Sequence, residues 1–257
     1  MPLMAIMMTN IRSLSSLQNP LVKHLVKIRQ NSDYRQEHQS VVLEGSTVIA
    51  EVAKTHPIKR LLTVDLCLIP SEISAEEILQ VDQAILDKIS GMQHSPGVLA
   101  EVKMPSPSPL KNIRSLLVLN QINDPGNLGT LIRSALAFGW ECIFIVNQSC
   151  DIFNEKAIRS ARGATFRLPY RKGDLQELEE ILTHNKLTTW VADVSGTPMQ
   201  DITAPEKVAL VLSNEARGVS SSTHPLFSQH VTIPMSGKME SLNVAVAGAI
   251  LLHYLKK

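Results

Sequence analysis

Short apolar runs alternate with segments of helical spacing along the second half of the chain. Residues 115–120 (SLLVLN) are apolar almost throughout, which is typical of a strand buried on both faces of a parallel sheet. The same reasoning predicts strands at 142–146, 189–192, 208–212 and 230–233, and helices at 128–139, 154–162, 175–185 and 242–256. Because strands that alternate with helices form parallel sheets with helices on their faces, this half predicts an α/β domain.

The first half shows the same alternation with shorter elements. Asn19 followed by Pro20 predicts the start of a helix, because Asn caps helix N-termini and Pro is tolerated in the first turn. Further strands are predicted at 41–43, 58–64 and 97–102, and further helices at 47–54 and 75–89. This half therefore predicts a smaller, mostly parallel α/β unit.

Prolines at alternate positions separate the two halves. Pro105, Pro107 and Pro109 cannot continue a helix or a central strand, and they favour an extended, semi-rigid spacer. A length of 257 residues also suits two domains. We therefore predict an N-terminal domain at 1–103, a Pro/Ser linker at 104–112 and a C-terminal domain at 113–257.

Composition narrows the class of protein. The chain is 44% hydrophobic, which allows it to bury ordinary cores without disulfides. Cys67, Cys142 and Cys150 form no CxxC pair, so we interpret them as buried small side chains in a reduced compartment. The eight histidines show no HExxH or comparable ligand spacing, so no metal is predicted.

The sequence favours neither a secretory signal nor a membrane-spanning segment. Residues 1–8 are apolar but lack the charged leader and the small-residue cleavage site of a secretory signal. No apolar run approaches the roughly 20 residues that span a bilayer. We predict a soluble, cytoplasmic protein that binds no membrane, and the sequence leaves import into an organelle open.

A formal net charge of +1 constrains any surface for nucleic acid, because affinity for phosphates depends on clustered Lys and Arg. Such a surface must therefore be local. The most basic stretch of the N-terminal half supplies the candidate RNA contacts, which are Arg12, Lys23, Lys27, Arg29 and Arg35. A solvated charged face is the competing interpretation of the same residues.

Three polar loops follow predicted strands in the C-terminal half. The first reads NDPGNLG at 123–129, with Arg133 one turn further on. Its glycines are spaced GxxG, so neither the dinucleotide fingerprint GxGxxG nor the phosphate loop GxxxxGK[ST] is present. The second reads SNEARG at 213–218, and the third reads IPM at 233–235 and SLN at 241–243.

Each loop alone has a plain structural interpretation. The first two are compatible with capped turns, and Ser241 or Asn243 is compatible with a simple helix cap. All three nevertheless follow the carboxyl ends of predicted strands, which is where open α/β sheets bind ligands.

Taken together and in this order, the three loops resemble the signature motifs of the SpoU branch of the SPOUT methyltransferases, also called the TrmH family. The resemblance covers residues 113–255. A weaker resemblance extends upstream to a substrate-binding domain that precedes many such enzymes and is itself similar to an RNA-binding ribosomal-protein fold. It rests on NPLVK at 19–23, VVLEG at 41–45 and PGVLA at 96–100.

The resemblance implies a fold and an activity. The fold is a Rossmann-like parallel sheet whose C-terminal segment forms a trefoil knot, preceded by the smaller α/β RNA-binding domain. The activity is methyl transfer from S-adenosylmethionine to a ribose 2′-hydroxyl of structured RNA by a homodimer, with the small-residue helix 243–255 at its interface. The implied catalytic residues are Asn127, Arg133, Glu215, Ser241 and Asn243. The implied donor-binding residues are Ser213, Ile233, Met235 and Leu242.

Two positions need separate treatment. Residues 213–216 read Ser-Asn-Glu-Ala where the family has Gly-Asn-Glu-Gly, and a side chain at 213 would be strained if the backbone there had φ above zero. Serine is small, and we expect it to be tolerated. The family's proposed base is the arginine that matches Arg133, but a guanidinium, with a pKa above about 12, rarely gives up a proton. We predict instead that Arg133 grips the target phosphate and stabilises charge on the 2′-oxygen.

Ribosomal RNA is the predicted substrate, by analogy with enzymes that carry such an N-terminal domain. The alternatives are a transfer-RNA ribose methyltransferase and a non-catalytic RNA-binding or ribosome assembly factor on the same fold. A dinucleotide-dependent oxidoreductase is disfavoured because the glycine fingerprint is absent.

Overall fold

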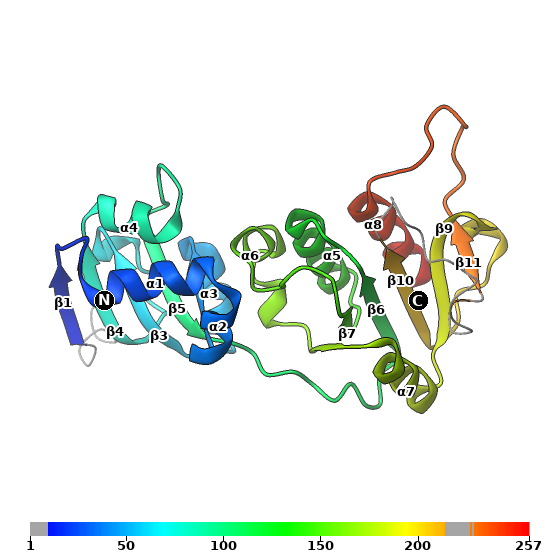
Figure 1. Cartoon of the computed structure of the whole chain (residues 1–257), viewed down its shortest axis with the longest axis horizontal. Coiled ribbons are helices and arrows are strands. Elements are labelled where there is room, and N and C mark those ends of the chain that lie inside the picture. The colour runs from blue at the N-terminus through cyan, green and yellow to red at the C-terminus, as the bar shows by residue number, and fades with distance from the viewer. Residues whose placement is uncertain (1–9, 214–226, 228, 257) are drawn as a thin grey trace. The chain divides into compact units, whose positions relative to one another are not determined.

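The computed structural model describes residues 10–213, 227 and 229–256. The chain divides into two compact units (Figure 1), which are described separately. Unit 1 contains the residues up to 105 together with 153–167, and unit 2 contains 106–152 and the residues from 168 onward. The predicted linker, 104–112, contains no helix or strand. The segment 153–167 groups with unit 1, although the sequence placed it in the C-terminal domain.

Unit 1 is built around a five-stranded mixed sheet. In spatial order its strands are β1 (Asn10–Leu14), β4 (Ala75–Val81), β3 (Ile58–Thr63), β5 (Val98–Lys103) and β2 (Ser40–Glu44). β1, β4 and β3 are parallel, whereas β5 runs antiparallel to both β3 and β2. The prediction of a mostly parallel unit is confirmed for β1, β4 and β3 and is wrong for β5, which enters the sheet between β3 and β2 from the opposite end.

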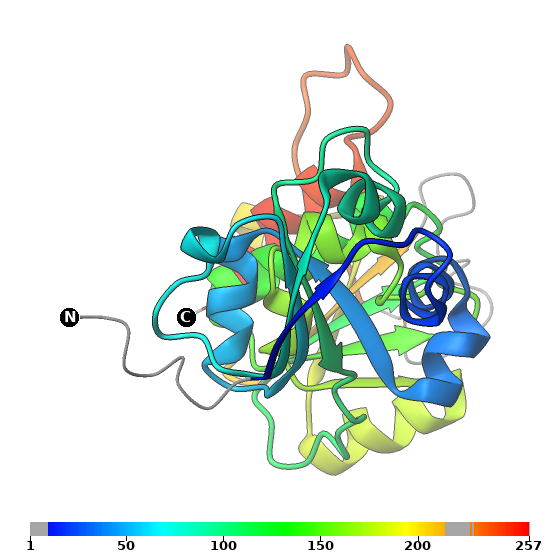
Figure 2. The ribbon, with the colours of Figure 1, turned by 90° about the vertical axis from the view of Figure 1, so that its left-hand side faces the viewer.

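Helices complete unit 1. They are α1 (Pro20–Gln30), α2 (Ser32–His38), α3 (Ser46–Ala53), α4 (Gln83–Ser90) and α6 (Glu155–Ala161). Figure 2 looks nearly along the axis of α1, which lies beside the sheet. As predicted, α1 begins at Pro20, and the Asn19 side chain accepts a hydrogen bond from the Leu21 N–H. Its buried residues join one apolar cluster with those of α4.

The single helix predicted at 75–89 is in fact strand β4 followed by helix α4. β4 pairs with β1 on one side and with β3 on the other, and this central place buries Ile78, Leu79 and Val81. Pairing and burial of this kind override the local preference of Glu and Leu for helix. β1 and α2 are too short and too polar for the sequence pattern to indicate them.

A buried carboxylate joins three strands of unit 1. Glu101 on β5 is fully buried and accepts hydrogen bonds from Arg60 Nη1 on β3 (2.5 Å) and Ser40 Oγ on β2 (2.9 Å). Lys59 Nζ lies 3.1 Å from the same carboxylate, and Arg60 Nε also donates to Glu77 on β4 (3.0 Å). Burial by itself would raise the pKa of Glu101, but the hydrogen bonds from Arg60 and Lys59 outweigh it and hold the pKa below its ordinary value.

Unit 2 contains a six-stranded sheet in which all neighbouring strands are parallel. In spatial order the strands are β11 (His230–Thr232), β9 (Thr188–Pro198), β10 (Val208–Ser213), β6 (Ser115–Asn120), β7 (Cys142–Val146) and β8 (Tyr170–Gly173). The predicted parallel α/β sheet is confirmed. β8 and the second half of β9 lack the apolar runs that would have indicated them.

The order of the strands reverses beside β6. β7 and β8 follow β6 on one side, while β10, β9 and β11 lie on the other. Such a reversal leaves a crevice at the carboxyl ends of the two strands between which it occurs, here β6 and β10. Asn120 and Ser213 are register partners at these two ends.

The helices of unit 2 cover its sheet and are α5 (Pro125–Ala137), α7 (Leu175–Asn185) and α8 (Val244–Leu255). α5 and α8 lie side by side and run in the same direction. Halfway along, Gly248 of α8 approaches Leu131 of α5 so closely that an added Cβ would lie 2.3 Å from Leu131 Cδ2. At the far ends, the rings of Phe138 and His253 are 5.2 Å apart.

α5 begins at Pro125, three residues before the predicted start at Leu128. The Asp124 side chain accepts a hydrogen bond from the Asn127 N–H (2.7 Å), and a proline follows the cap. This Asp-Pro start satisfies the first turn of the helix. Much of the first polar loop is therefore helical.

The cysteines only partly match their interpretation as buried side chains. Cys142 is buried, and burial raises the pKa of its thiol to about 12. Cys150 is half-buried, and burial raises its pKa to about 11. Cys67, by contrast, is exposed in a short turn after β3, so the interpretation is wrong for this residue.

Candidate functional site

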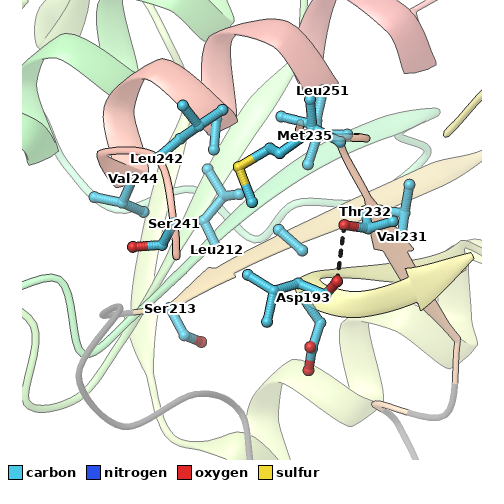
Figure 3. A pocket seen from close by; sticks show the side chains of 14 residues that line it. Asp193, Leu212, Ser213, Val231, Thr232, Met235, Ser241, Leu242, Val244 and Leu251 are labelled. Carbon is cyan, nitrogen blue, oxygen red and sulfur yellow. Dashed lines mark hydrogen bonds between the residues drawn. The ribbon is translucent and has the colours of Figure 1, made fainter. Parts of the chain in front are cut away.

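A cleft in unit 2 lies between β9, β10, β11 and the beginning of α8 (Figure 3). It encloses about 790 Å³ of empty space, part of which is open to solvent. Its walls are largely apolar and include Leu212, Val231 and Leu251. A largely apolar cleft with a few polar groups is typical of a site for a small ligand.

All four predicted donor-binding residues line this cleft, namely Ser213, Ile233, Met235 and Leu242. They come from the end of β10, from the segment after β11 and from the approach to α8. Ser241, predicted to act in catalysis, lines it as well. In Figure 3, Ser213 and Asp193 lie on one side of the cleft, with Met235 and Leu251 on the other. The cleft therefore brings together parts of the second and third polar loops.

Serine at position 213 fits its surroundings. Its hydroxyl accepts a hydrogen bond from Asn120 Nδ2 at the end of β6 (3.2 Å). Ser213 belongs to β10 and is not among the residues with positive φ, so a side chain there causes no backbone strain. The departure from the family's glycine is accommodated, and the side chain links the ends of two neighbouring strands.

The first and third polar loops meet directly. Asn243 Nδ2 donates a hydrogen bond to Asn127 Oδ1 (3.2 Å) across 116 residues of sequence. Asn243 is also the N-cap of α8, since its Oδ1 accepts from the Ala245 N–H (2.9 Å). The simple capping role thus holds for Asn243, and the contact with Asn127 is added to it.

Arg133 lies on the exposed face of α5. It is about two turns, or roughly 9 Å along the helix axis, from Asn127. Side chains on a helix lean towards its N-terminus, so Arg133 leans towards the end of α5 where Asn127 and Asn243 meet. Within the described residues its guanidinium has no hydrogen bond or ion pair, which leaves the guanidinium free for a ligand. Glu215, the remaining predicted catalytic residue, lies outside the described residues.

The five candidate RNA contacts of unit 1 differ in their availability. Arg35 is buried, and its Nη1 donates to the carbonyls of Ile28 (2.8 Å) and Arg29 (2.7 Å) at the end of α1. Its prediction as an RNA contact is therefore corrected, because its guanidinium serves the fold. The Arg29 side chain is only 13% exposed and pairs with Glu155 (2.5 Å).

The other three candidates remain at the surface. Lys23 and Lys27 are exposed on α1, and Lys27 Nζ lies 4.2 Å from the centre of the Tyr34 ring. The Arg12 side chain is 63% exposed, with Nε 3.6 Å from Glu77. An ion pair this exposed is weak and leaves the arginine available to a phosphate.

Sequence reasoning missed two polar residues of the site, Asn120 and Asp193. Asn120 ends β6 and holds Ser213, and Asp193 lines the cleft from β9. A usable signal for Asp193 was present, because this acid follows directly on the strand predicted at 189–192. The rule that ligands bind at carboxyl strand ends applies to it as it does to the three loops.

Metal sites and membrane-spanning helices are both absent from the described part of the chain. It contains no group of three or more His, Cys, Asp or Glu side chains arranged to hold a metal ion. Among its helices, none has the length and apolar character needed to cross a bilayer.

Two protein families match the chain. The SpoU rRNA Methylase family matches residues 114–253, and the MRM3-like substrate binding domain matches residues 19–100. The 23S rRNA (guanosine(2553)-2'-O)-methyltransferase RlmP of Bacillus subtilis (strain 168) is 29% identical over 249 residues, which cover 96% of this chain and 100% of the relative.

Two solved structures show the same fold. The AdoMet bound rRNA methyltransferase from Sinorhizobium meliloti has a TM-score of 0.85 at 24% identity, covering 95% of this chain and 97% of its own. The SpoU Methyltransferase AviRb from Streptomyces viridochromogenes, in complex with the cofactor AdoMet, has a TM-score of 0.82 at 22% identity, covering 93% of this chain and 97% of its own.

The parallel sheet and the polar loops at its reversal point define an α/β domain of the SPOUT methyltransferase fold. The chain belongs to the SpoU rRNA methylase family. The family predicted from the three loops is thereby confirmed.

Proposed function

We propose that this enzyme transfers a methyl group from S-adenosylmethionine to a ribose 2′-hydroxyl of ribosomal RNA. The observation that carries the proposal is the contact of Asn127 with Asn243, beside the cleft that Ser213 lines. It brings parts of all three signature loops to one edge of the sheet. The Bacillus relative, a 23S rRNA ribose methyltransferase, and the AdoMet-bound neighbours support the same activity.

The residues of the cleft fit such a donor. Leu212, Met235 and Leu242 offer apolar surface for an adenine ring, and Asp193 and Ser213 offer polar groups beside it. When bound, S-adenosylmethionine supplies a methyl group on a sulfonium, which is already electrophilic. The chain's task is then to align the 2′-oxygen with that methyl group and to exclude water.

Arg133 and the paired asparagines would act on the RNA side. Arg133 is exposed and permanently charged, so it can bind the phosphate next to the target ribose and stabilise negative charge on the 2′-oxygen. Asn127 and Asn243, which are hydrogen-bonded to each other at the N-terminal ends of α5 and α8, orient the ribose. Ser241 at the rim of the cleft, together with Glu215, completes the proposed set.

Mapping ribose methylation across total RNA tests this function. RNA from cells with and without the gene is compared, and one 23S-type ribosomal position is expected to lose its 2′-O-methyl group in the deletion strain. Restoration by the wild-type gene, but not by the Arg133→Ala gene, excludes an indirect effect. Loss of a transfer-RNA methyl group instead would identify a different substrate, and no loss at all would refute the activity.

Asn127→Ala is expected to lower the methylation rate roughly tenfold or more, because misplaced reacting groups are costly. The variant loses the hydrogen bond to Asn243, but Asn127 does not line the cleft, so the Kd for S-adenosylhomocysteine should stay unchanged. Single-turnover kinetics and calorimetry measure the two quantities. Asn147→Ala, an exposed asparagine that directly follows β7 and lies outside the three loops, is the control. Abolished donor binding in Asn127→Ala would contradict its place on the RNA side.

We also propose a C-terminal trefoil knot and a homodimer. The similarity to SPOUT structures supports the knot, which tracing the chain in an experimental map would test.

The proposed homodimer interface includes α8. On this helix, Val246 is 51% exposed, and this apolar surface suits an interface with a second copy. Sedimentation of the active enzyme is expected to give a dimer, and an active monomer would contradict it.

The proposed role of the residues around 19–100 is to hold the RNA substrate. The match to a substrate binding domain supports this role, as do the exposed Arg12, Lys23 and Lys27. The bacterial relatives support a cytoplasmic place of action, which cell fractionation would test. Charge reversal of the three residues should weaken RNA binding more at low salt than at high salt.

A further inference from the structure

Asp193 is the acidic side chain among the described residues that line the cleft. It lies where the pairing of β9 with β11 shifts its register, with His230 opposite Val191 and Val231 opposite Thr197. The residues between, 192–196, are therefore displaced from the regular ladder. Register shifts of this kind often redirect a side chain next to a ligand site.

The displaced segment is held firmly. An added Cβ on Gly196 would lie 2.6 Å from the backbone nitrogen of Val231, so only glycine fits there without a shift of backbone. Thr232 Oγ1 also donates to the Val194 carbonyl (3.1 Å), as Figure 3 shows. The contacts of β11 with Val194 and Gly196 therefore hold the segment that follows Asp193.

The carboxylate of Asp193 has three hydrogen bonds with other residues that the structure describes. Oδ1 accepts from the Ser195 N–H (2.9 Å) and from Ser195 Oγ (2.7 Å), and Oδ2 lies 3.1 Å from His230 Nδ1. The N–H of Ser195, its hydroxyl and His230 together lower the pKa of Asp193, so it is ionised at neutral pH. A carboxylate accepts about four hydrogen bonds, so the described residues leave one place, on Oδ2.

A hydrogen-bond acceptor lies beside each ring nitrogen of His230. Nδ1 faces the ionised Asp193, and Nε2 lies 2.8 Å from the Phe227 carbonyl. His230 therefore links the Asp193 carboxylate to the backbone at Phe227 and fixes the position of Oδ2.

We propose that Asp193 Oδ2 accepts a hydrogen bond from one ribose hydroxyl of the methyl donor, with His230 as its positioning residue. The proposal rests on the function proposed above and assigns one new contact in that site. A neutral hydroxyl suits the single remaining acceptor place. The donor's ammonium group suits it less, because it carries three N–H donors and would find one acceptor place on Oδ2.

Calorimetry with S-adenosylhomocysteine and its 2′-deoxy and 3′-deoxy forms tests the contact. For the wild-type protein, removal of one of the two hydroxyls is expected to weaken binding about tenfold, the usual effect of a hydrogen bond to a charged group. In Asp193→Asn, the same removal should cost threefold or less, because the charged acceptor is gone. The exposed Asp201→Asn is the matched control and should keep the full penalty.

A second ligand distinguishes a contact with the ribose from a contact with the ammonium group. 5′-Methylthioadenosine, which has the ribose but no ammonium group, should lose as much affinity as S-adenosylhomocysteine in Asp193→Asn. A loss confined to S-adenosylhomocysteine would mean that Asp193 binds the ammonium group and would overturn the proposal. Thermal melting of each variant confirms that it is folded.

His230 is tested by a conservative replacement. His230→Asn places an amide N–H near the position of Nδ1 and should keep most of the deoxy penalty, whereas His230→Leu should lose it. Equal penalties in wild type, Asp193→Asn and His230→Leu would overturn the inference and leave the proposed function standing. A wild-type protein that binds no S-adenosylhomocysteine would overturn both.

Discussion

Arg133→Ala is expected to lower the rate of ribose methylation at saturating donor by roughly 100-fold or more, the usual cost of removing a group that stabilises charge in the transition state. Arg133 is exposed on α5 and has no internal partner among the described residues, so the free energy of unfolding should not change. It does not line the cleft, so the Kd for S-adenosylhomocysteine should also stay the same. Single-turnover rates with an rRNA fragment and calorimetry measure both.

Arg133→Lys separates positive charge from hydrogen-bond geometry. Lysine keeps the charge but loses the planar fork that grips a phosphate with two parallel hydrogen bonds, so the rate should stay well below wild type. Arg114→Ala, an exposed arginine just before β6, is the matched control and should be fully active. Near-normal turnover of Arg133→Lys would show that the fork is not needed. Near-normal turnover of Arg133→Ala would remove Arg133 from the site.

Glu101→Gln is expected to lower the free energy of unfolding by about 3 kcal/mol at pH 7, the usual cost of removing one partner of a buried ion pair. Glu101 is fully buried, and the change leaves Arg60 and Lys59 without their shared counter-charge. Denaturation in urea, followed by circular dichroism, measures the loss. Glu76→Gln on β4, in the same sheet, is exposed and serves as the control, with an expected change near zero.

The loss caused by Glu101→Gln should depend on pH. The pKa of Glu101 is lower in the folded chain than its ordinary value, so ionised Glu101 stabilises the fold above the unfolded-state pKa of about 4.3. This stability disappears as the pH falls through the folded pKa and the carboxylate is protonated. The difference between wild type and variant should therefore be constant near neutral pH and shrink below about pH 4. A difference independent of pH would mean that charge is not its cause.

Much of the site could be predicted because its strands are unambiguous. The apolar runs that became β6 and β10 have no polar position that could face solvent, so they indicate buried parallel strands. Once those strands are placed, their carboxyl ends locate the polar loops that follow. The cap of α8 could be predicted for the same reason, since Asn243 directly precedes an Ala-rich helix.

Other features depend on partners distant in the sequence. Residues 75–81 have a helix-like composition, and only pairing with both β1 and β3 makes them a strand. Arg35 and the exposed Lys27 are both basic residues of the same basic stretch, so the sequence does not distinguish them. Arg35 is buried because its guanidinium donates to the carbonyls at the end of α1. The role proposed for Asp193 depends on a register shift against β11, which no local pattern displays.

Gly248 of α8 lies against α5 and the sheet, where there is no room for a side chain. An added Cβ there would also lie 2.6 Å from Leu212 Cδ1, so the spacing between α8, α5 and the sheet depends on its bare backbone. The same spacing allows Asn243 to donate its hydrogen bond to Asn127 at the N-terminal ends of α8 and α5. If Asn127 and Asn243 orient the ribose as proposed, a larger residue at 248 that shifts these helices is expected to lower the turnover rate more than it lowers the melting temperature.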